Sequence, residues 1–232
     1  MQETQAVVDA AKIIGISIRT APKSAGVDDI AYTIIGDSQK KDLANEIRKI
    51  ATMLLKENND PKIRKAIELD WHSDAEACEK SDCVILVGVK GRRPLGFNCG
   101  GCGFKTCHEF QSAEPPKTIF MAGPFCTFKL LDLGIALSSA AKAAADFNID
   151  NRIMYRTGLA GYRLGLVKEY NPILGLSLSA SGKNIYFDRK EKTEAKELWR
   201  QINSYQSAAA SAEGGSHQSP AIGDRGKATG DR

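Results

Sequence analysis

The alternation of apolar and polar positions along the chain predicts alternating helices and strands. Apolar runs bounded by glycine or turn residues at 31–37, 83–91 and 172–181 predict strands, and 83–91 is the clearest buried one. Proline within 118–126 argues against a helix there and favours an extended segment. Apolar residues at helical spacing predict the remaining elements, which are helices over 4–14, 38–60, 60–70, 129–147 and 191–205.

For two of these helices the sequence also predicts a cap or a buried face. Ser38 is a favourable helix N-cap, since its short polar side chain can accept a hydrogen bond from the first turn. The helix that follows repeats apolar residues at Leu43, Ile47, Ile50 and Leu54. One face of the alanine-rich helix over 129–147 is expected to present Leu130, Leu133, Leu137, Ala140 and Ala144.

Composition changes after Tyr205. Residues 206–232 contain almost no large apolar side chain and are rich in glycine, serine and alanine. Such a segment cannot bury enough surface to offset the entropy of ordering, so it is expected to be a disordered tail. Residues 1–205 are enough for one substantial domain, and alternating helices and strands place it in the α/β (α+β) class.

Charge and hydropathy exclude several function classes. The chain has 32 basic and 28 acidic residues, a net charge of +4, and no basic stripe with interleaved aromatics, so no nucleic acid partner is expected. No run of 18 apolar residues lacks charge, which argues against a membrane span. The first residues lack a basic region followed by an apolar run, so no secretory signal is visible and a cytoplasmic location is expected.

Four cysteines carry the strongest chemical signal. They follow the pattern Cys99-x2-Cys102-x4-Cys107-x18-Cys126, with glycines at 100, 101 and 103. Four converging thiolates hold an iron–sulfur cluster, and glycine lets backbone N–H groups turn toward it. The same thiolates could hold a structural zinc ion, although the second short pair of a zinc ribbon is missing. Disulfides are disfavoured in a reducing compartment, and chance clustering is the remaining alternative.

A family resemblance narrows the choice of metal. The stretch "CGGCGFKTCHEF" with its distant fourth cysteine resembles the single-cluster motif of corrinoid iron–sulfur proteins and of the ferredoxin-like subunit of Rnf complexes. That resemblance implies Cys99, Cys102, Cys107 and Cys126 as ligands of one 4Fe-4S cluster. The whole chain also resembles a family of uncharacterised bacterial and archaeal proteins described only as containing a ferredoxin domain.

A second resemblance concerns the scaffold. Segments 19–47, 131–159 and 171–190 are similar, in order, to parts of FMN-dependent nitroreductases. This implies a mixed sheet flanked by helices, a cluster loop inserted at about 92–127, and a homodimer with flavin at its interface. The positions that match flavin contacts are Arg19, Thr20, Lys23, Ser24, Gly158, Leu159 and Arg189. The chain departs from the family in lacking its N-terminal Arg-x-Ser-x-Arg grip and in having "VDDI" at 27–30, where Asp28 and Asp29 are expected to cap a turn.

The other candidate residues receive structural interpretations. Cys83 opens an apolar strand and is expected to be a small buried hydrophobe, and Cys78 lacks further cysteines with which to build a second cluster. His108 follows the third cysteine and could donate a hydrogen bond to a cluster or stay solvated.

The sequence therefore predicts an iron–sulfur redox protein with one 4Fe-4S cluster, and an FMN-dependent reductase, an oxidoreductase, is one form of this hypothesis. The alternatives are a non-enzymatic electron carrier without flavin and a zinc-stabilised binding module. The expected partner is a redox protein or a small-molecule substrate.

Overall fold

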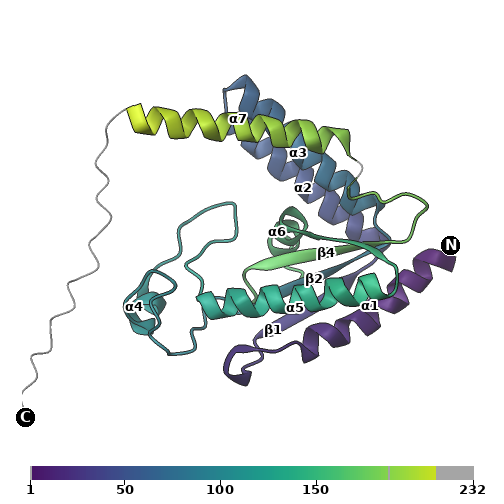
Figure 1. Ribbon diagram of the computed structural model, residues 1–232, viewed down its shortest axis with the longest axis horizontal. Helices are drawn as coiled ribbons and strands as arrows, with labels where there is room; N and C mark the ends of the chain where they lie inside the picture. The colour runs from purple at the N-terminus through teal and green to yellow at the C-terminus, as the bar shows by residue number, and fades with distance from the viewer. Residues whose placement is uncertain (1, 188, 213–232) are drawn as a thin grey trace, which may run out of the picture.

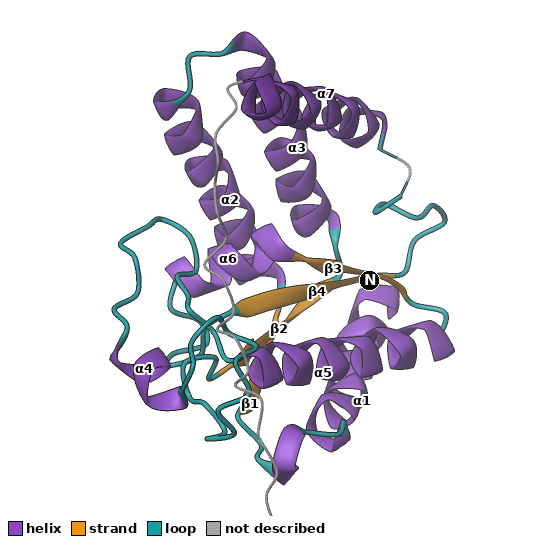
Figure 2. Ribbon diagram, turned by 60° about the vertical axis from the view of Figure 1, so that its left-hand side comes forward, coloured by secondary structure: helices purple, strands orange, loops and turns teal. Residues whose placement is uncertain are grey.

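A four-stranded sheet with helices on both faces forms the body of the molecule (Figures 1 and 2). The computed structural model describes residues 2–187 and 189–212. The strands are β1 (Ile30–Ile35), β2 (Cys83–Val89), β3 (Asp150–Met154) and β4 (Ile173–Ser179), in the order β1-β2-β4-β3. The helices are α1 (Gln2–Thr20), α2 (Asp37–Glu57), α3 (Pro61–Lys80), α4 (Cys107–Ser112), α5 (Thr127–Asp146), α6 (Tyr155–Arg163) and α7 (Lys190–Ala212).

The sheet flanked by helices agrees with the fold class expected from the sequence. The sequence argument expected a mixed sheet, but the neighbouring strands pair antiparallel throughout, and the parallel contact found among the described residues is an isolated bridge between Lys90 and Asn171. None of the helices in the described part of the chain has the length and apolar character needed to cross a membrane.

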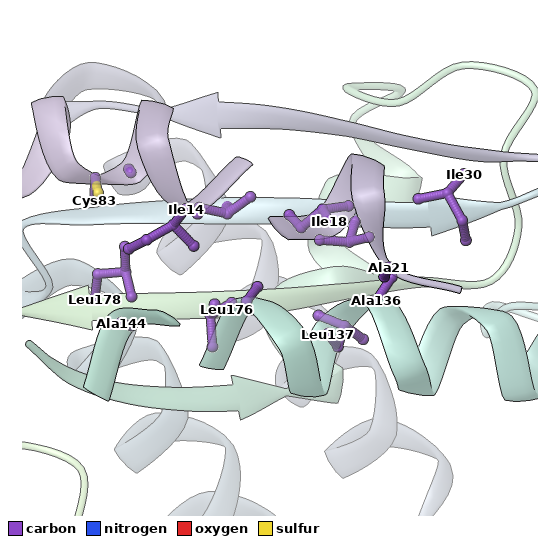
Figure 3. Packing of buried hydrophobic residues seen from close by; sticks show 14 of the residues in the cluster. Ile14, Ile18, Ala21, Ile30, Cys83, Ala136, Leu137, Ala144, Leu176 and Leu178 are labelled. Atoms are coloured by element: carbon purple, nitrogen blue, oxygen red, sulfur yellow. The ribbon is translucent and has the colours of Figure 1, made fainter. Parts of the chain in front are cut away.

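Strand β2 has both faces buried, which explains its continuous apolar sequence. Cys83, Ile85 and Val87 pack against α1 and α5 on one face, where Figure 3 shows Ile14 and Leu137 meeting the strands. The alternate residues Val84 and Leu86 pack against α2, α3 and α6 on the other face. The two helical layers are therefore separated by the sheet.

Two of the predicted helices start or end at other residues than the sequence argument expected. Helix α2 begins at Asp37 with Gly36 as its N-cap, so the prediction of Ser38 as the cap is wrong. Helix α3 continues to Lys80 instead of ending near residue 70. The middle of this helix buries Asp70 and Asp74. Buried carboxylates interrupt the apolar period, and this hid the helix from the periodicity argument.

The elements that were not predicted from the sequence include α4, β3 and α6. Strand β3 is a polar, half-buried edge strand, and α6 contains Gly158 and Gly161, which lower helix propensity. Helix α7 extends to Ala212, past the expected end at residue 205, and the rest of the expected tail, 213–232, lies outside the described residues. On α5, Leu130 is 42% exposed, and its neighbour Lys129 is buried instead.

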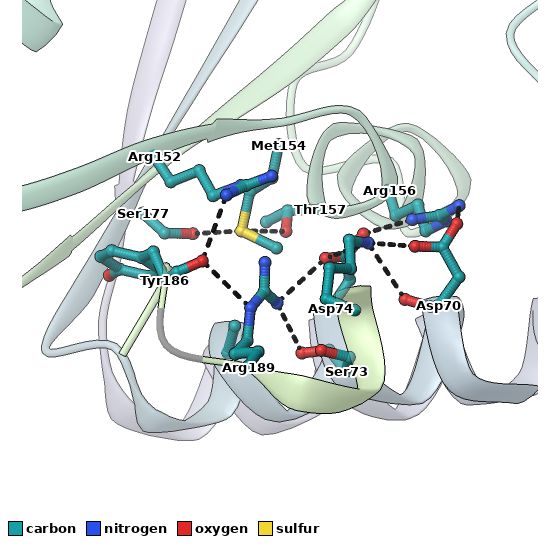
Figure 4. Close-up of polar contacts among 12 residues, drawn as sticks. Asp70, Ser73, Asp74, Arg152, Met154, Arg156, Thr157, Ser177, Tyr186 and Arg189 are labelled. Carbon is teal, nitrogen blue, oxygen red and sulfur yellow. Dashed lines mark hydrogen bonds and ion pairs between the residues drawn. The ribbon is translucent and has the colours of Figure 1, made fainter. Parts of the chain in front are cut away.

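Helices α3, α6 and α7 are joined by a partly buried ion-pair network (Figure 4). Arg156 pairs with both Asp70 and Asp74, and Asp74 also lies 3.2 Å from Arg189 and 2.9 Å from Lys192. Burial alone would raise the pKa of Asp74, but the charges of Lys192 and Arg156 outweigh it and hold that pKa below its ordinary value. The network therefore favours the ionised carboxylate.

Candidate cysteine site

The cysteine-rich segment leaves and re-enters the body of the molecule at one point. The backbone N–H of Cys126 donates to the carbonyl oxygen of Gly91 over 2.8 Å. A Cβ at Gly91 would lie 2.6 Å from the carbonyl oxygen of Asn171, so only glycine fits this crossing. Residues 92–125, which we call the cysteine lobe, project beyond this point beside the start of α5 (Figure 1). The two ends of the cysteine lobe therefore lie next to each other, as the ends of an inserted loop must.

Within the lobe, glycines and one asparagine shape the loop that carries three of the cysteines. Gly100 and Gly103 have φ values of 72° and 88°, and the N–H of Gly103 donates to the carbonyl of Gly100 over 2.9 Å. This left-handed backbone is accessible to glycine at little cost. The side-chain oxygen of Asn98 accepts a hydrogen bond of 2.8 Å from the N–H of Cys107 and closes the loop.

The loop lies against the first turn of α5, next to the fourth cysteine. A Cβ at Gly101 would lie 2.9 Å from the hydroxyl oxygen of Thr127, so the loop backbone is in contact with this turn. The rings of Phe97 and Phe128 meet edge to face, with centroids 5.4 Å apart. Cys126 is the N-cap of α5 and its side chain makes no capping hydrogen bond. Two parts of the chain that carry cysteines are thus brought to one end of one helix.

The four thiols differ in exposure. Cys99 is exposed, Cys102 and Cys107 are half-buried and Cys126 is buried. Among the described residues, no three His, Cys, Asp or Glu side chains form a group that could hold a metal ion, so the four-cysteine ligand set stays a prediction. The all-sulfur donor set and the backbone placement fit an iron–sulfur cluster. His108, in the first turn of α4, is exposed.

Cys78 and Cys83 are separate from this site. Both are fully buried, Cys78 in the core beneath α3 and Cys83 in the core beneath α1 and α5. Burial raises the pKa of each thiol to about 12, so both are neutral thiols at physiological pH. The placement agrees with the structural interpretation of both residues.

A buried ion cluster lies under the junction of lobe and body. Lys129, with no exposed surface, places its Nζ atom 2.9 Å from Asp29 Oδ2 and 3.9 Å from Asp132 Oδ2. Arg93 reaches the other oxygen of Asp29 at 2.8 Å. Asp132 Oδ1 accepts hydrogen bonds from the N–H and the hydroxyl of Ser24. The cluster joins the lobe, α5 and the chain before β1.

The sequence argument missed this role of Asp29. Turn capping, which it expected for both aspartates, is found at Asp28, whose Oδ1 accepts from the N–H of Ile30 over 3.2 Å. The spacing of Lys129 and Asp132 at i and i+3 on an expected helix was the available signal, since such residues are neighbours on a helix surface.

The first group of expected flavin contacts lies at the C-terminal end of α1, and its polar side chains bind the chain itself. Arg19 pairs with Asp28 and donates to the carbonyl oxygen of Ile30. Thr20 donates to the carbonyl of Ile16, Lys23 to those of Ile18 and Arg19, and Ser24 to Asp132. These four positions lie on the α1 and α5 side of the sheet.

The remaining expected flavin contacts lie on the opposite side of the sheet. A Cβ at Gly158 would come within 2.1 Å of the carbonyl oxygen of Ile173, so glycine is needed there for α6 to pack on β4. Leu159 is fully buried in the second core, and Arg189 belongs to the network around Asp74. The seven positions therefore do not meet within one chain, and flavin binding stays a prediction.

Comparisons with known proteins found one family model and one relative that match this chain. A family model described as "Uncharacterized protein containing a ferredoxin domain" matches residues 122–189, a stretch that includes Cys126 but not the cysteine loop. An uncharacterized protein from Archaeoglobus fulgidus is 40% identical over 190 residues, which cover 82% of this chain and 95% of the relative.

Solved structures with a weak similarity to this chain include a nitroreductase and an FMN oxidoreductase. A nitroreductase with bound FMN from Desulfitobacterium hafniense has a TM-score of 0.48 at 16% identity, over 75% of this chain and 78% of its own. An NADPH:FMN oxidoreductase from Vibrio harveyi, complexed with NAD+, has a TM-score of 0.44 at 11% identity, over 89% of this chain and 82% of its own. Similarities this weak say nothing about the cofactor of the present chain. The close relative and the matching family model show that the chain belongs to the family of uncharacterized proteins containing a ferredoxin domain.

Proposed function

We propose that this chain is an electron carrier that holds one 4Fe-4S cluster through Cys99, Cys102, Cys107 and Cys126. The observation that carries the proposal is the contact of the glycine-rich loop with the first turn of α5, where Gly101 meets Thr127 beside Cys126. A cluster of this kind needs three ligands from one loop and a fourth from a distant segment that fixes the loop to the fold. The membership in a ferredoxin-domain family supports the same cofactor.

The chain's own groups suit a negatively charged metal–sulfur centre. The first turn of α5 presents backbone N–H groups and the positive end of a 20-residue helix next to Cys126. Gly100 and Gly103 allow the loop backbone to turn because both have positive φ, a conformation that strains other residues even though the space around each Cβ position is open. When bound, a 4Fe-4S cluster supplies one-electron transfer. The exposure of Cys99 supports a cluster close to the surface, which a carrier requires.

The placement of the expected flavin contacts favours a carrier over a flavin-dependent reductase. Arg19, Ser24 and Arg189 are bonded to groups of the chain, and the sheet separates the first group from Gly158 and Leu159. A flavin site built from all seven positions would need a second copy of the chain. A homodimer stays a prediction, and the exposed apolar side chains of Ile13, Ile16, Leu131 and Ile135 on α1 and α5 are those that an interface on these helices would cover.

The test is an anaerobic purification followed by an absorption spectrum and assays of iron, sulfide, zinc and flavin. We expect a broad band near 400 nm, about four irons and four sulfides per chain, and no flavin. Cys102→Ser should lose most of the iron, and the buried Cys78→Ser is the matched control that should keep it. Zinc in place of iron would contradict the proposal and leave a structural module. Stoichiometric FMN beside the iron would favour the reductase.

A further inference from the structure

The net charge of the chain is concentrated around the cysteine lobe. The cysteine lobe, residues 92–125, contains four basic residues, Arg92, Arg93, Lys105 and Lys117, and two acidic ones, Glu109 and Glu114. That excess of two is half of the net charge of +4 of the whole chain, carried by 34 of its 232 residues. An even distribution would have left the lobe nearly neutral.

Several of these cations keep their charge at the surface. Lys105 and Lys117 are exposed, and neither forms an ion pair within the described residues. Arg92 donates to the carbonyl oxygen of Ala113 over 2.6 Å, and its guanidinium lies 5.7 Å from the ring of Phe110. These partners are neutral and cancel no charge. Arg93, 64% exposed, shares the buried carboxylate of Asp29 with Lys129.

The same lobe exposes an aromatic side chain and a thiol. Phe97 is 54% exposed, and its contact with the ring of Phe128 holds it at the start of α5. Cys99, two residues later, is exposed as well. Interfaces between proteins combine an aromatic centre with charged residues around it, and complementary charge accelerates the encounter. The lobe has both an exposed aromatic side chain and surrounding positive charge, next to the cysteines through which electrons would leave or enter.

We propose that the cysteine lobe is the docking surface for an acidic protein, namely the one-electron carrier that exchanges electrons with this chain. The inference rests on the proposed electron carrier function. Nucleic acid fits the surface less well, because the exposed cations are few and form no stripe with interleaved aromatics. The rest of the chain has an excess of only two basic residues over 198 residues and contributes little to steering.

The experiment measures binding of the iron-loaded protein to a small acidic 2Fe-2S ferredoxin at low and high salt. We expect the affinity to fall steeply with salt, and the double variant Lys105→Glu/Lys117→Glu to weaken it about tenfold or more at low salt. The matched control is Lys62→Glu/Lys196→Glu, which makes the same change in net charge at exposed positions of α3 and α7, on the other side of the sheet from α5. The control should bind like the unmodified protein.

Iron content measured on every sample separates the two proposals. A protein that holds iron but binds the ferredoxin with no salt dependence, or equally in both double variants, overturns the docking surface and leaves the cluster proposal standing. A protein without iron whose binding still depends on Lys105 and Lys117 supports the surface and contradicts the cluster. Binding of a single-stranded DNA oligonucleotide in preference to the ferredoxin, lost in the lobe variant, would overturn the choice of partner.

Discussion

Replacement of Lys129 by methionine tests whether the buried ion cluster holds α5 in place. Lys129 has no exposed surface and lies 2.9 Å from Asp29, which is also nearly fully buried. Removal of one partner of a buried ion pair leaves the other charge uncompensated and costs about 3–5 kcal/mol. Arg93 still reaches Asp29 in the variant, so we expect the lower end, about 3 kcal/mol of unfolding free energy.

The same helix provides the control. Lys142 pairs with Asp146 at 2.6 Å, but the two side chains are 76% and 62% exposed. Exposed pairs of this spacing contribute about 0.3–0.5 kcal/mol, so Lys142→Met should have little effect on unfolding. Urea unfolding followed by the fluorescence of Trp71 and Trp199 measures both variants. With a slope of about 3 kcal/mol per molar urea, Lys129→Met should lower the midpoint by about 1 M and Lys142→Met by about 0.1 M.

The double variant Lys129→Met/Asp29→Asn separates charge burial from simple packing. Since the second substitution removes the carboxylate that the first one stranded, the double variant should lose less stability than the sum of the two single variants. Equal midpoint shifts for the Lys129 and Lys142 variants, or strictly additive losses in the double variant, would refute the reasoning that a desolvated ion pair joins α5 to the chain before β1.

Three further predictions concern other parts of the molecule. Gly158→Ala should lower the free energy of unfolding by about 3 kcal/mol, because the new Cβ would meet the carbonyl oxygen of Ile173. Gly134→Ala has nothing within 4 Å of the new Cβ and should raise the free energy of unfolding by about 0.5–1 kcal/mol. Urea midpoints that shift in the same direction for both variants would contradict this prediction. The lowered pKa of Asp74 contributes stability that is complete above its unfolded value of 3.8 and is lost as pH falls through the folded value. Asp74→Asn should therefore be destabilising near pH 7, with a difference from the unmodified protein that shrinks below about pH 4, and a constant difference would oppose this origin. Burial raises the pKa of Cys78 to about 12, so iodoacetamide at about pH 8 should modify it only in urea, as mass spectrometry of native and unfolded samples can show.

The sequence predicts the elements whose physics is local. Strand β2 is buried on both faces, and α5 buries apolar side chains at helical spacing from Leu133 to Ala144, so both elements are visible in the pattern of residues. Elements that are stabilised by residues far away in the sequence are not visible in this pattern. Helix α3 buries Asp70 and Asp74, whose counterions come from α6 and α7, and no window of neighbouring residues contains that information.

The same distinction between local and distant constraints applies to the candidate cysteine site. The spacing of the cysteines predicts a metal-binding chemistry, because three ligands within nine residues need only a short loop. The position of that loop depends on contacts across the chain, such as the hydrogen bond from Cys126 to Gly91 and the pairing of Lys129 with Asp29. The glycines illustrate the point. Gly103 adopts a left-handed backbone that the motif suggests, whereas Gly158, whose expected flavin contact stays a prediction, is required by the approach of α6 to β4. A residue type in a motif thus predicts its chemistry only when the constraint on it is local.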